Sequence, residues 1–259
     1  MTEPIAQGSA GGGTQGSNGG NGGGAINIVA DKLVNDGTIS VNGAGGANGN
    51  YRQASGGGAG GSLWVDVNTL EGVGSFQAKG GAGKEYSGYA GGGGSGGRIA
   101  VYYVSESFTG SYVAYGGLEQ GSTAAQSGAA GTIYVFDETA NRKYLTYSHN
   151  NSTYNGAAGN TFEATLADSL YQLTLAKGAV VFVEDGVDIT VTDDVTFGDT
   201  TRFTLADSNY QINLTAGGDF TLGGNAAMAI SNVYATGTLP KFSVAGDFTM
   251  GNGSSLLSN

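Results

Sequence analysis

Hydrophobic and polar residues alternate along four segments that each follow a glycine-rich run. The segments begin at Ala25, Ser62, Arg98 and Thr132, so their starts recur at nearly equal intervals. Alternation with a period of two is typical of a β-strand that has one buried face. In the first three segments a glycine falls twelve residues after the start, and a second alternating strand follows it. Each repeat therefore reads as strand, turn, strand and long glycine-rich loop.

The same alternation predicts which side chains face the core. On the first strands these are Ile26, Ile28, Leu63, Val65, Val67, Ile99, Val101, Ile133 and Val135. On the second strands they are Ile39, Val41, Phe76, Ala78, Tyr112 and Ala114, and apolar corners recur at Leu33, Leu70 and Phe108. One repeat buries only a few side chains at roughly 1.5–3 kcal/mol each, while ordering its backbone costs about 1–2 kcal/mol per residue. The repeats must therefore stack and share one core.

Short alternating strands continue beyond about Asn155, where the glycine-rich runs stop. "TLADSLYQLTLAKG" (165–178) returns further along the chain as "TLADSNYQINLTAGG" (204–218). A shorter echo joins "DDVTFGD" (193–199), "GDFTLGG" (218–224) and "GDFTMGN" (246–252). Short strands between frequent turn signals predict an all-β region. We interpret the longer repeat as two coils of about twenty residues each.

Together the patterns predict an all-β chain folded as a right-handed parallel β-helix (β-solenoid), with long glycine-rich loops leaving one side. Residues 1–154 form glycine-rich repeats of about 36 residues, and residues 155–259 continue the same stack without long loops. A sandwich does not require successive segments to resemble each other. A propeller blade needs roughly four strands, whereas each glycine-rich repeat shows two.

Glycine supplies 51 of the 259 residues. The chain is also 39% hydrophobic, with 14 Tyr and 10 Phe, which favours order over low-complexity disorder. An ordered glycine costs about 0.5–1 kcal/mol relative to alanine, so four glycine-rich loops in register need a structural reason. We hypothesise that "GGGGSGG" (91–97) is a packed, polyproline II-like layer that lies against outward aromatic rings such as Tyr102.

Charge and composition exclude several classes of protein. A net charge of −11 argues against nucleic-acid binding, and the absence of cysteine excludes disulfides and thiol chemistry. No apolar run approaches the length of a membrane span, so membrane insertion is not expected. The start, "MTEPIAQGSA", has no signal-peptide pattern. Either the protein is not secreted, or the sequence is an internal or processed piece of a longer protein; the repeats favour the second interpretation.

Two motifs carry a resemblance to known proteins. "GGGGSGGRIAVYY" (91–103) and "GGGAGGSLWVDVNTLEG" (56–72) resemble a glycine-rich repeat of very large secreted bacterial surface proteins. "GDFTLGGNAAMAI" (218–230) is similar to the β-helical stalks of filamentous adhesins and autotransporter passengers. The resemblance implies an extracellular β-solenoid that serves as a stalk, an adhesin or a matrix component. It transfers no catalytic motif.

Candidate chemistry is sparse, and we predict no catalytic or cofactor-binding residue. The run "AKGGAGKEYS" (78–87) has Ala78 and Glu85 where a phosphate-binding loop needs glycine and Ser or Thr. The single histidine, His149, is expected to be a solvated loop residue. Acidic residues cluster between Glu184 and Asp199 without a basic partner, which does not favour a polysaccharide lyase or hydrolase. The chain is therefore predicted not to be an enzyme.

Two further kinds of site compete with structural roles for the same residues. Asp193, Asp194 and Asp199 are weak candidates for Ca²⁺ ligands, although acidic residues in turns usually accept backbone N–H groups. A flat threonine ladder could template ice. The threonines that lie close in sequence have no fixed coil spacing, which makes ice binding less favoured; they are Thr190, Thr192, Thr196, Thr201 and Thr204.

Aromatic residues are the candidates for contact with a ligand or surface. Trp64, Tyr102 and Tyr134 fall on the outward side of the first strands, where the alternative is that glycine loops cover them. The centres of the glycine-rich loops carry further candidates, Tyr51, Arg52, Tyr86 and Tyr89.

These observations favour a structural or adhesive segment of an extracellular bacterial surface protein or filament. Such a segment would act as a stiff stalk or fibre building block and would assemble head to tail. Its expected partners are copies of itself or neighbouring solenoid segments, and surface glycans. The alternatives are a carbohydrate-binding or carbohydrate-cleaving β-helix and, less favoured, an ice-binding protein.

Overall fold

The computed structural model describes residues 2–14, 16–47, 54–85, 89–120, 126–149, 159–162, 170–183, 188–207, 213–232 and 241–258. These residues form β-strands and no helix. Within the same ranges, no helix is long and apolar enough to cross a bilayer. The chain divides into two compact units, one formed mainly by Met1–Arg142 and the other mainly by Gly159–Asn259. The division falls inside strand β8 (Arg142–Ser148).

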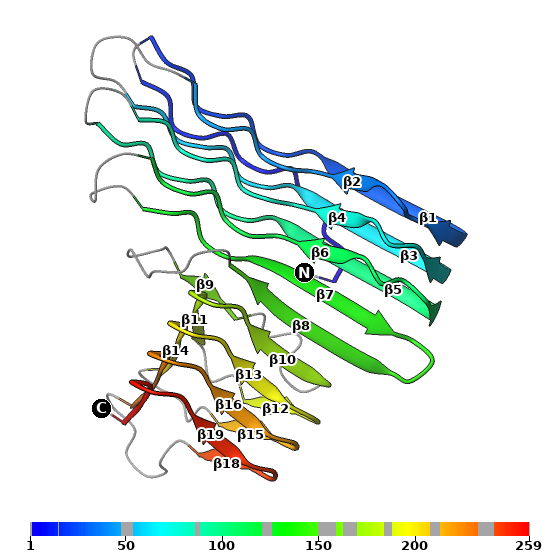
Figure 1. The fold of residues 1–259 in the computed structure, drawn as a ribbon, viewed down its shortest axis with the longest axis vertical. Helices are drawn as coiled ribbons and strands as arrows, with labels where there is room; N and C mark the ends of the chain where they lie inside the picture. The colour runs from blue at the N-terminus through cyan, green and yellow to red at the C-terminus, as the bar shows by residue number, and fades with distance from the viewer. Residues whose placement is uncertain are drawn as a thin grey trace. The chain divides into compact units, whose positions relative to one another are not determined.

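In the first unit the long first strands of the repeats lie side by side in one parallel sheet (Figure 1). They are β1 (Ala25–Val34), β3 (Ser62–Glu71), β5 (Arg98–Glu106) and β7 (Gly131–Asp137). Ala25 pairs with Ser62, Ser62 with Arg98, and Arg98 with Thr132. This register confirms the predicted alignment of the four segments, residue for residue.

The second strands form a separate parallel sheet of β2 (Thr38–Ser40), β4 (Ser75–Gln77) and β6 (Ser111–Val113). The inward residues of both sheets meet in one core, as predicted. At the corner the rings of Phe76, Phe108 and Tyr112 lie with their centroids 5.3–5.5 Å apart. The fourth repeat departs from this plan. The three-stranded sheet ends at β6, so β8 does not continue it.

The glycine-rich loops are ordered where the structure describes them. Each loop contributes two extended legs, and the legs lie beside those of the neighbouring repeats (Figure 1). The legs are 8–13 and 19–24, then 41–47 and 55–61, then 78–84 and 91–97, then 114–120 and 126–131. Together they form what we call the glycine layer.

Backbone hydrogen bonds in this layer follow a period of three residues. In leg 55–61, Gly56 N and Ala59 N donate to Gly12 O and Ser9 O of leg 8–13, each at 2.9 Å. Gly57 N and Gly60 N donate to leg 91–97, and Gly58 N and Gly61 N donate to leg 41–47, at 2.8–3.0 Å. A polyproline II helix has three residues per turn, so successive N–H groups point in three directions. Each direction meets a different neighbouring leg, which satisfies the backbone.

Glycine is required because the legs approach each other closely. A Cβ atom added to Gly58 would lie 2.1 Å from Asn21 O, and one added to Gly94 would lie 2.0 Å from Gly58 O. The same holds in the stretch 91–97, where the nearest atoms to most added Cβ atoms belong to the backbone of other legs. The hypothesis of a packed layer therefore agrees with the structure, but the proposed neighbour does not. These glycines face other glycine segments and not the Tyr102 ring.

The second unit is built from three parallel sheets that the chain visits in turn. One contains β10 (Gln172–Leu175), β13 (Val195–Phe197), β16 (Phe220–Leu222) and β19 (Phe248–Met250). The second contains β9 (Asn160–Thr161), β11 (Val180–Val183), β14 (Arg202–Asp207), β17 (Ala227–Asn232) and β20 (Ser255–Ser258). The third contains β12 (Ile189–Val191), β15 (Leu214–Ala216) and β18 (Phe242–Val244).

The predicted coil length agrees with the register at the first steps of this unit, and the later coils are longer. Hydrogen bonds between equivalent corner residues of successive repeats span 25 residues from Asp194 to Asp219 and 28 residues from Asp219 to Asp247. The first steps are shorter, because Leu173 pairs with Val195 and Val180 with Arg202, and they agree with the predicted coils of about twenty residues.

The parts of the longer repeat that are described in both copies lie on β10 and β15, which belong to different sheets, so that repeat is not itself a stacking step. Its beginning, residues 165–169, lies outside the described residues. The shorter echo marks the true step, because its residues Phe220 and Phe248 pair in register, with ring centroids 5.6 Å apart.

Candidate functional site

The aromatic candidates on the first strands are partly covered by the N-terminal segment. The Tyr102 hydroxyl donates a hydrogen bond of 2.8 Å to Thr2 O, and Ser62 Oγ donates one of 2.6 Å to Ala6 O. Pro4, between these contacts, is buried. Trp64 on β3 is half-buried, and its indole Nε1 is buried without a hydrogen-bond partner. The cover over Tyr102 is thus the chain start and not a glycine-rich loop.

Tyr134 and Tyr102 pack together on this outward side. Their ring centroids lie 5.6 Å apart, and Tyr102 also meets the ring of Phe136 edge to face at 5.8 Å. Tyr134 is only 2% exposed, which leaves little of its ring for a ligand. Burial raises the pKa of both tyrosine hydroxyls above the ordinary value of 10.0.

Only one of the predicted contacts at the loop centres falls within the described residues. Tyr89 is 49% exposed. Tyr51, Arg52 and Tyr86 lie outside the described residues.

The acidic candidates accept hydrogen bonds from neighbouring repeats of the stack. Asp194 Oδ1 accepts from Asp219 N, and Asp199 Oδ1 accepts from Gly224 N, both at 2.8 Å. Asp193 Oδ2 accepts from Gln172 Nε2 at 2.9 Å. Among the described residues no three acidic or histidine side chains gather as a metal site would require. The geometry therefore gives these three carboxylates a structural role in joining repeats.

These hydrogen bonds continue up the stack as a series that we call the Asx ladder. Asp219 Oδ1 in turn accepts from Asp247 N at 2.8 Å. A parallel series runs from Asp188 Oδ1, which accepts from Asn213 N, to Asn213 Oδ1, which accepts from Lys241 N. Each oxygen thus satisfies a backbone N–H at a corner, where no strand partner is available.

The single histidine lies in a different environment from the one predicted. His149 is 9% exposed, so the expectation of a solvated loop histidine was wrong. The polar sequence around it, "SHNNSTYN" (148–155), suggested a surface loop, but Tyr147 and Leu145 just before it are buried core residues of β8.

Threonines form a column that proximity in the sequence did not indicate. Thr174 pairs with Thr196, Thr196 with Thr221, and Thr221 with Thr249 along one sheet. The threonines proposed from the sequence mostly belong to different strands, and Thr201 is fully buried. The column runs up the stack, one residue per repeat, with strands about 4.8 Å apart.

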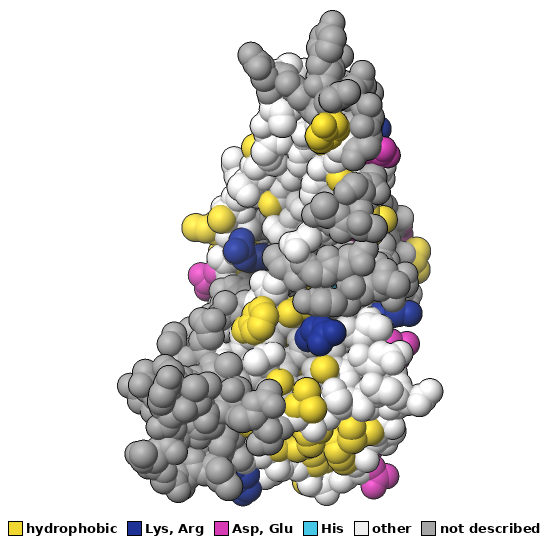
Figure 2. Space-filling model, turned by 90° about the vertical axis from the view of Figure 1, so that its left-hand side faces the viewer, with side chains coloured by type: hydrophobic (Ala, Val, Ile, Leu, Met, Phe, Trp, Pro, Cys, Tyr) yellow, Lys and Arg dark blue, Asp and Glu magenta, His cyan; other side chains and the backbone are white. Residues whose placement is uncertain are grey.

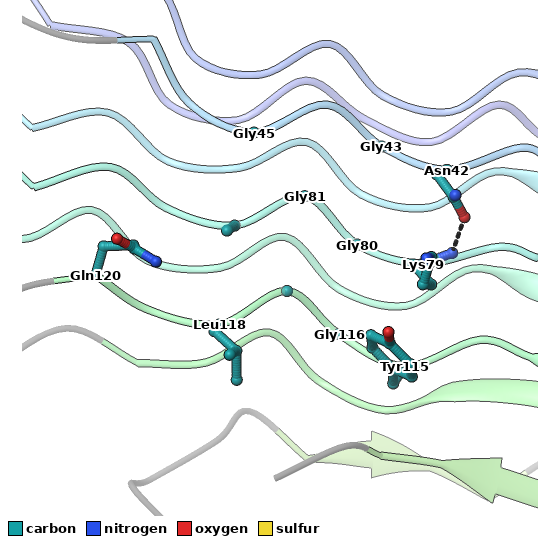
Figure 3. Close-up of a pocket in the computed structure, with 12 residues that line it drawn as sticks. Asn42, Gly43, Gly45, Lys79, Gly80, Gly81, Tyr115, Gly116, Leu118 and Gln120 are labelled. Atoms are coloured by element: carbon teal, nitrogen blue, oxygen red, sulfur yellow. Dashed lines mark hydrogen bonds between the residues drawn. The ribbon is translucent and has the colours of Figure 1, made fainter.

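A groove of about 480 Å³ lies on the first legs of the glycine layer. Figure 3 shows Tyr115 and Lys79 on one side of it and Leu118 and Gln120 on the other, with glycine backbone between them. The Lys79 Nζ atom lies 5.8 Å from the centre of the Tyr115 ring. These residues were not predicted. Their spacing could have found them, because Asn42, Lys79 and Tyr115 recur at the same interval as the strands of the repeats.

The C-terminal end of the second unit is apolar and open. Phe248 and Met250 of β19 are 41% and 43% exposed, whereas their partners Phe220 and Leu222 on β16 are fully buried. Leu256 and Leu257 of β20 are exposed as well. Figure 2 shows hydrophobic side chains gathered in the lower part of the face that it draws. We call the four exposed residues, Phe248, Met250, Leu256 and Leu257, the open end.

No family model, curated protein or solved structure matches this chain.

Proposed function

We propose that the chain is a β-solenoid segment that gives length and stiffness to an extracellular bacterial surface protein or filament. The observation that supports the proposal most is that like residues of successive repeats pair in register in parallel sheets. In the second unit the chain enters the three sheets in the same order in successive repeats, as β10, β11 and β12 and then β13, β14 and β15. That order supports a closed coil per repeat, and a right-handed winding is favoured for parallel strands.

The open end supports assembly by further stacking. Phe248 and Met250 occupy inward positions that another coil buries in every earlier repeat. Asp247 follows Asp194 and Asp219 in the Asx ladder, and those two each accept an N–H from the next repeat. An unpaired strand edge is itself a template for another strand. The end therefore suits one more coil of the same kind.

We take the occupant to be a second copy that stacks head to tail. A tail-to-tail arrangement would bring the Asp247 carboxylates of two copies together, and like charges repel. At the other end of the chain, Ile26 and Ile28 of β1 are only half-buried and Val29 is exposed. A head-to-tail contact is heterologous, so it propagates into a filament.

Electron microscopy and sedimentation velocity of the purified chain test this proposal. We expect filaments that lengthen with concentration. Phe248→Lys places a charge on the open end and should abolish them. Phe182→Lys is the matched control, because Phe182 is equally exposed at 40% but lies on β11, away from the open end. Monodisperse monomers of the unaltered chain at high concentration would contradict the proposal.

The threonine column favours ice binding as a second candidate. Thr196 and Thr249 are exposed, and the column repeats at the regular spacing of the strands. A thermal hysteresis measurement tests it. Activity that Thr196→Lys removes would support this candidate, and an absence of hysteresis in the unaltered chain would dismiss it.

A further inference from the structure

The groove on the glycine layer lies between two columns of side chains. Because the legs have three residues per turn, residues three apart project to the same side, about 9 Å apart along the leg. Stacking of the repeats then aligns equivalent positions into columns. One column contains Asn42, Lys79 and Tyr115, and the other contains Gly45, Ala82 and Leu118. The groove is therefore straight and runs across the legs.

The floor of this groove is fixed by the packing below it. A Cβ atom at Gly43, Gly80 or Gly117 would point into the layer and lie 1.9–2.2 Å from a backbone oxygen. The floor consequently carries no side chain and tolerates none. Its volume of about 480 Å³ is in the range of small-molecule sites.

The backbone donors of the glycine floor are used inside the layer. Gly43 N donates to Lys79 O at 2.8 Å, and Gly80 N donates to Tyr115 O at 2.9 Å, so these donors are used inside the layer. An added strand needs unpaired backbone groups at an edge. We therefore take the side chains that line the groove as the main contacts of a ligand.

The side chains that line the groove combine apolar surface with hydrogen-bond donors. The Tyr115 ring is half-buried and Leu118 is 45% exposed, while Lys79 and Gln120 supply N–H donors at the rim. Asn42 is occupied, since its Oδ1 accepts from Lys79 N at 2.7 Å and its Nδ2 donates to Gln77 Oε1 at 3.2 Å. Such a rim suits a molecule with flat apolar faces and hydroxyl edges.

We propose that this groove binds a neutral, straight-chain polysaccharide of β-linked hexoses. A hexose with equatorial hydroxyls has flat C–H faces for the Tyr115 ring and for Leu118. Its hydroxyls can accept from Lys79 and Gln120. When such sugars are joined through equatorial bonds at opposite ends of the ring, as in cellohexaose, the chain is extended, which matches two straight columns. The site binds without cleaving, because the residues that line it include no carboxylate and glycoside hydrolysis uses a pair of them.

Isothermal titration of the purified chain with cellohexaose, a straight β-linked probe, tests the proposal. Maltohexaose, which has the same sugars in a curved chain, is the matched ligand. We expect binding of cellohexaose and at least about tenfold weaker binding of maltohexaose. Tyr115→Ala should weaken cellohexaose binding about three- to tenfold, the range expected for one aromatic contact.

A groove-filling variant separates the site from general stability. Gly45 lies in the open column, and a Cβ there would meet only Ala82 O at an ordinary 3.4 Å. Gly45→Phe should therefore fill the groove and abolish binding while the chain keeps its melting temperature. Gly12→Phe is the control, because a Cβ at Gly12 meets nothing within 4 Å and the residue lies on another leg.

Three results would overturn the proposal. The first is the absence of measurable cellohexaose binding, and the second is cellohexaose binding that Gly45→Phe leaves unchanged. The third is tighter binding of maltohexaose than of cellohexaose. The filament assay does not involve the groove, so failure of one proposal leaves the other standing.

Discussion

The two units join their repeats in different ways. In the first unit the segments that connect strands are hydrogen-bonded backbone to backbone, in three directions, and most side chains are excluded from the contact. In the second unit the connections are corners, and carboxylates such as Asp194 and Asp219 accept the N–H of the next repeat. The long connections of the first unit thus form the glycine layer. The short connections of the second unit use a side-chain oxygen to accept the N–H of the next repeat.

The two solutions also differ in their energetic basis. Each ordered glycine lowers the folding stability by about 0.5–1 kcal/mol relative to alanine. One hydrogen bond contributes about 0.5–1.5 kcal/mol net to that stability. These magnitudes are similar, so a glycine leg gains stability only when several legs close their bonds together. In the second unit fully buried rings such as Phe197 and Phe220 supply much larger individual terms. We therefore expect a small substitution in the glycine layer to disturb several legs together, more cooperatively than a substitution in the second unit disturbs its repeats.

The largest expected effect comes from adding one methyl group inside the glycine layer. In Gly58→Ala the new Cβ would lie 2.1 Å from Asn21 O, so at least one leg must move. We expect a loss of about 1–3 kcal/mol in the free energy of unfolding, measured by urea denaturation. Gly12→Ala, with nothing near its Cβ, should be neutral or slightly stabilising. Equal stabilities of the two variants would show that the legs are not closely packed.

A smaller effect is expected in the Asx ladder. Asp219→Ala removes the oxygen that accepts from Asp247 N, at a cost of about 0.5–1.5 kcal/mol. Asp219→Asn keeps an oxygen at that position and should restore most of the loss. If both variants lost stability equally, charge and not the hydrogen bond would account for the role of Asp219.

Alkaline pH should act on the first unit. The pKa values of Tyr102, Tyr112 and Tyr134 are raised above 10.0 mainly by burial, with Glu106 adding to the effect on Tyr112. The folded state therefore holds protons that the unfolded chain releases, and stability is complete below about pH 10 and falls above it. Denaturation monitored at several pH values checks this trend. A stability that did not decline above pH 10 would mean that these hydroxyls are not shielded from water.

The smallest expected effect is that of removing calcium. Because Asp193, Asp194 and Asp199 accept protein N–H groups, EDTA should leave the melting temperature unchanged. A clear drop that added Ca²⁺ reverses would assign these carboxylates to a metal.

Much of the strand arrangement could be read from the sequence, because a repeated pattern encodes both the alternation and the register. The pairing of Leu33 with Leu70, for example, follows directly from the alignment of the repeats. In the second unit the predicted coil of about twenty residues agrees with the pairing of Leu173 with Val195, but the later coils are longer. The longer spacing of the later coils is contained in the echo around Val195, Phe220 and Phe248, through residues that pair in the sheet.

The candidate sites were harder to predict, because they depend on which segments meet. No local pattern indicates that Thr2 O covers the Tyr102 hydroxyl, one hundred residues away. Nor does glycine content alone reveal that legs pack on legs, which places Lys79 beside Tyr115. To predict these two contacts, one needs the register between repeats together with the period of three along each leg.

That period of three limits how the loops of this chain can change in length. Inserting one or two residues into a leg would rotate every later N–H group away from its acceptor. Inserting three would add one full turn and return each group to its own neighbour. Related loops should therefore gain or lose residues within their legs in multiples of three, while the turns that join the legs vary freely.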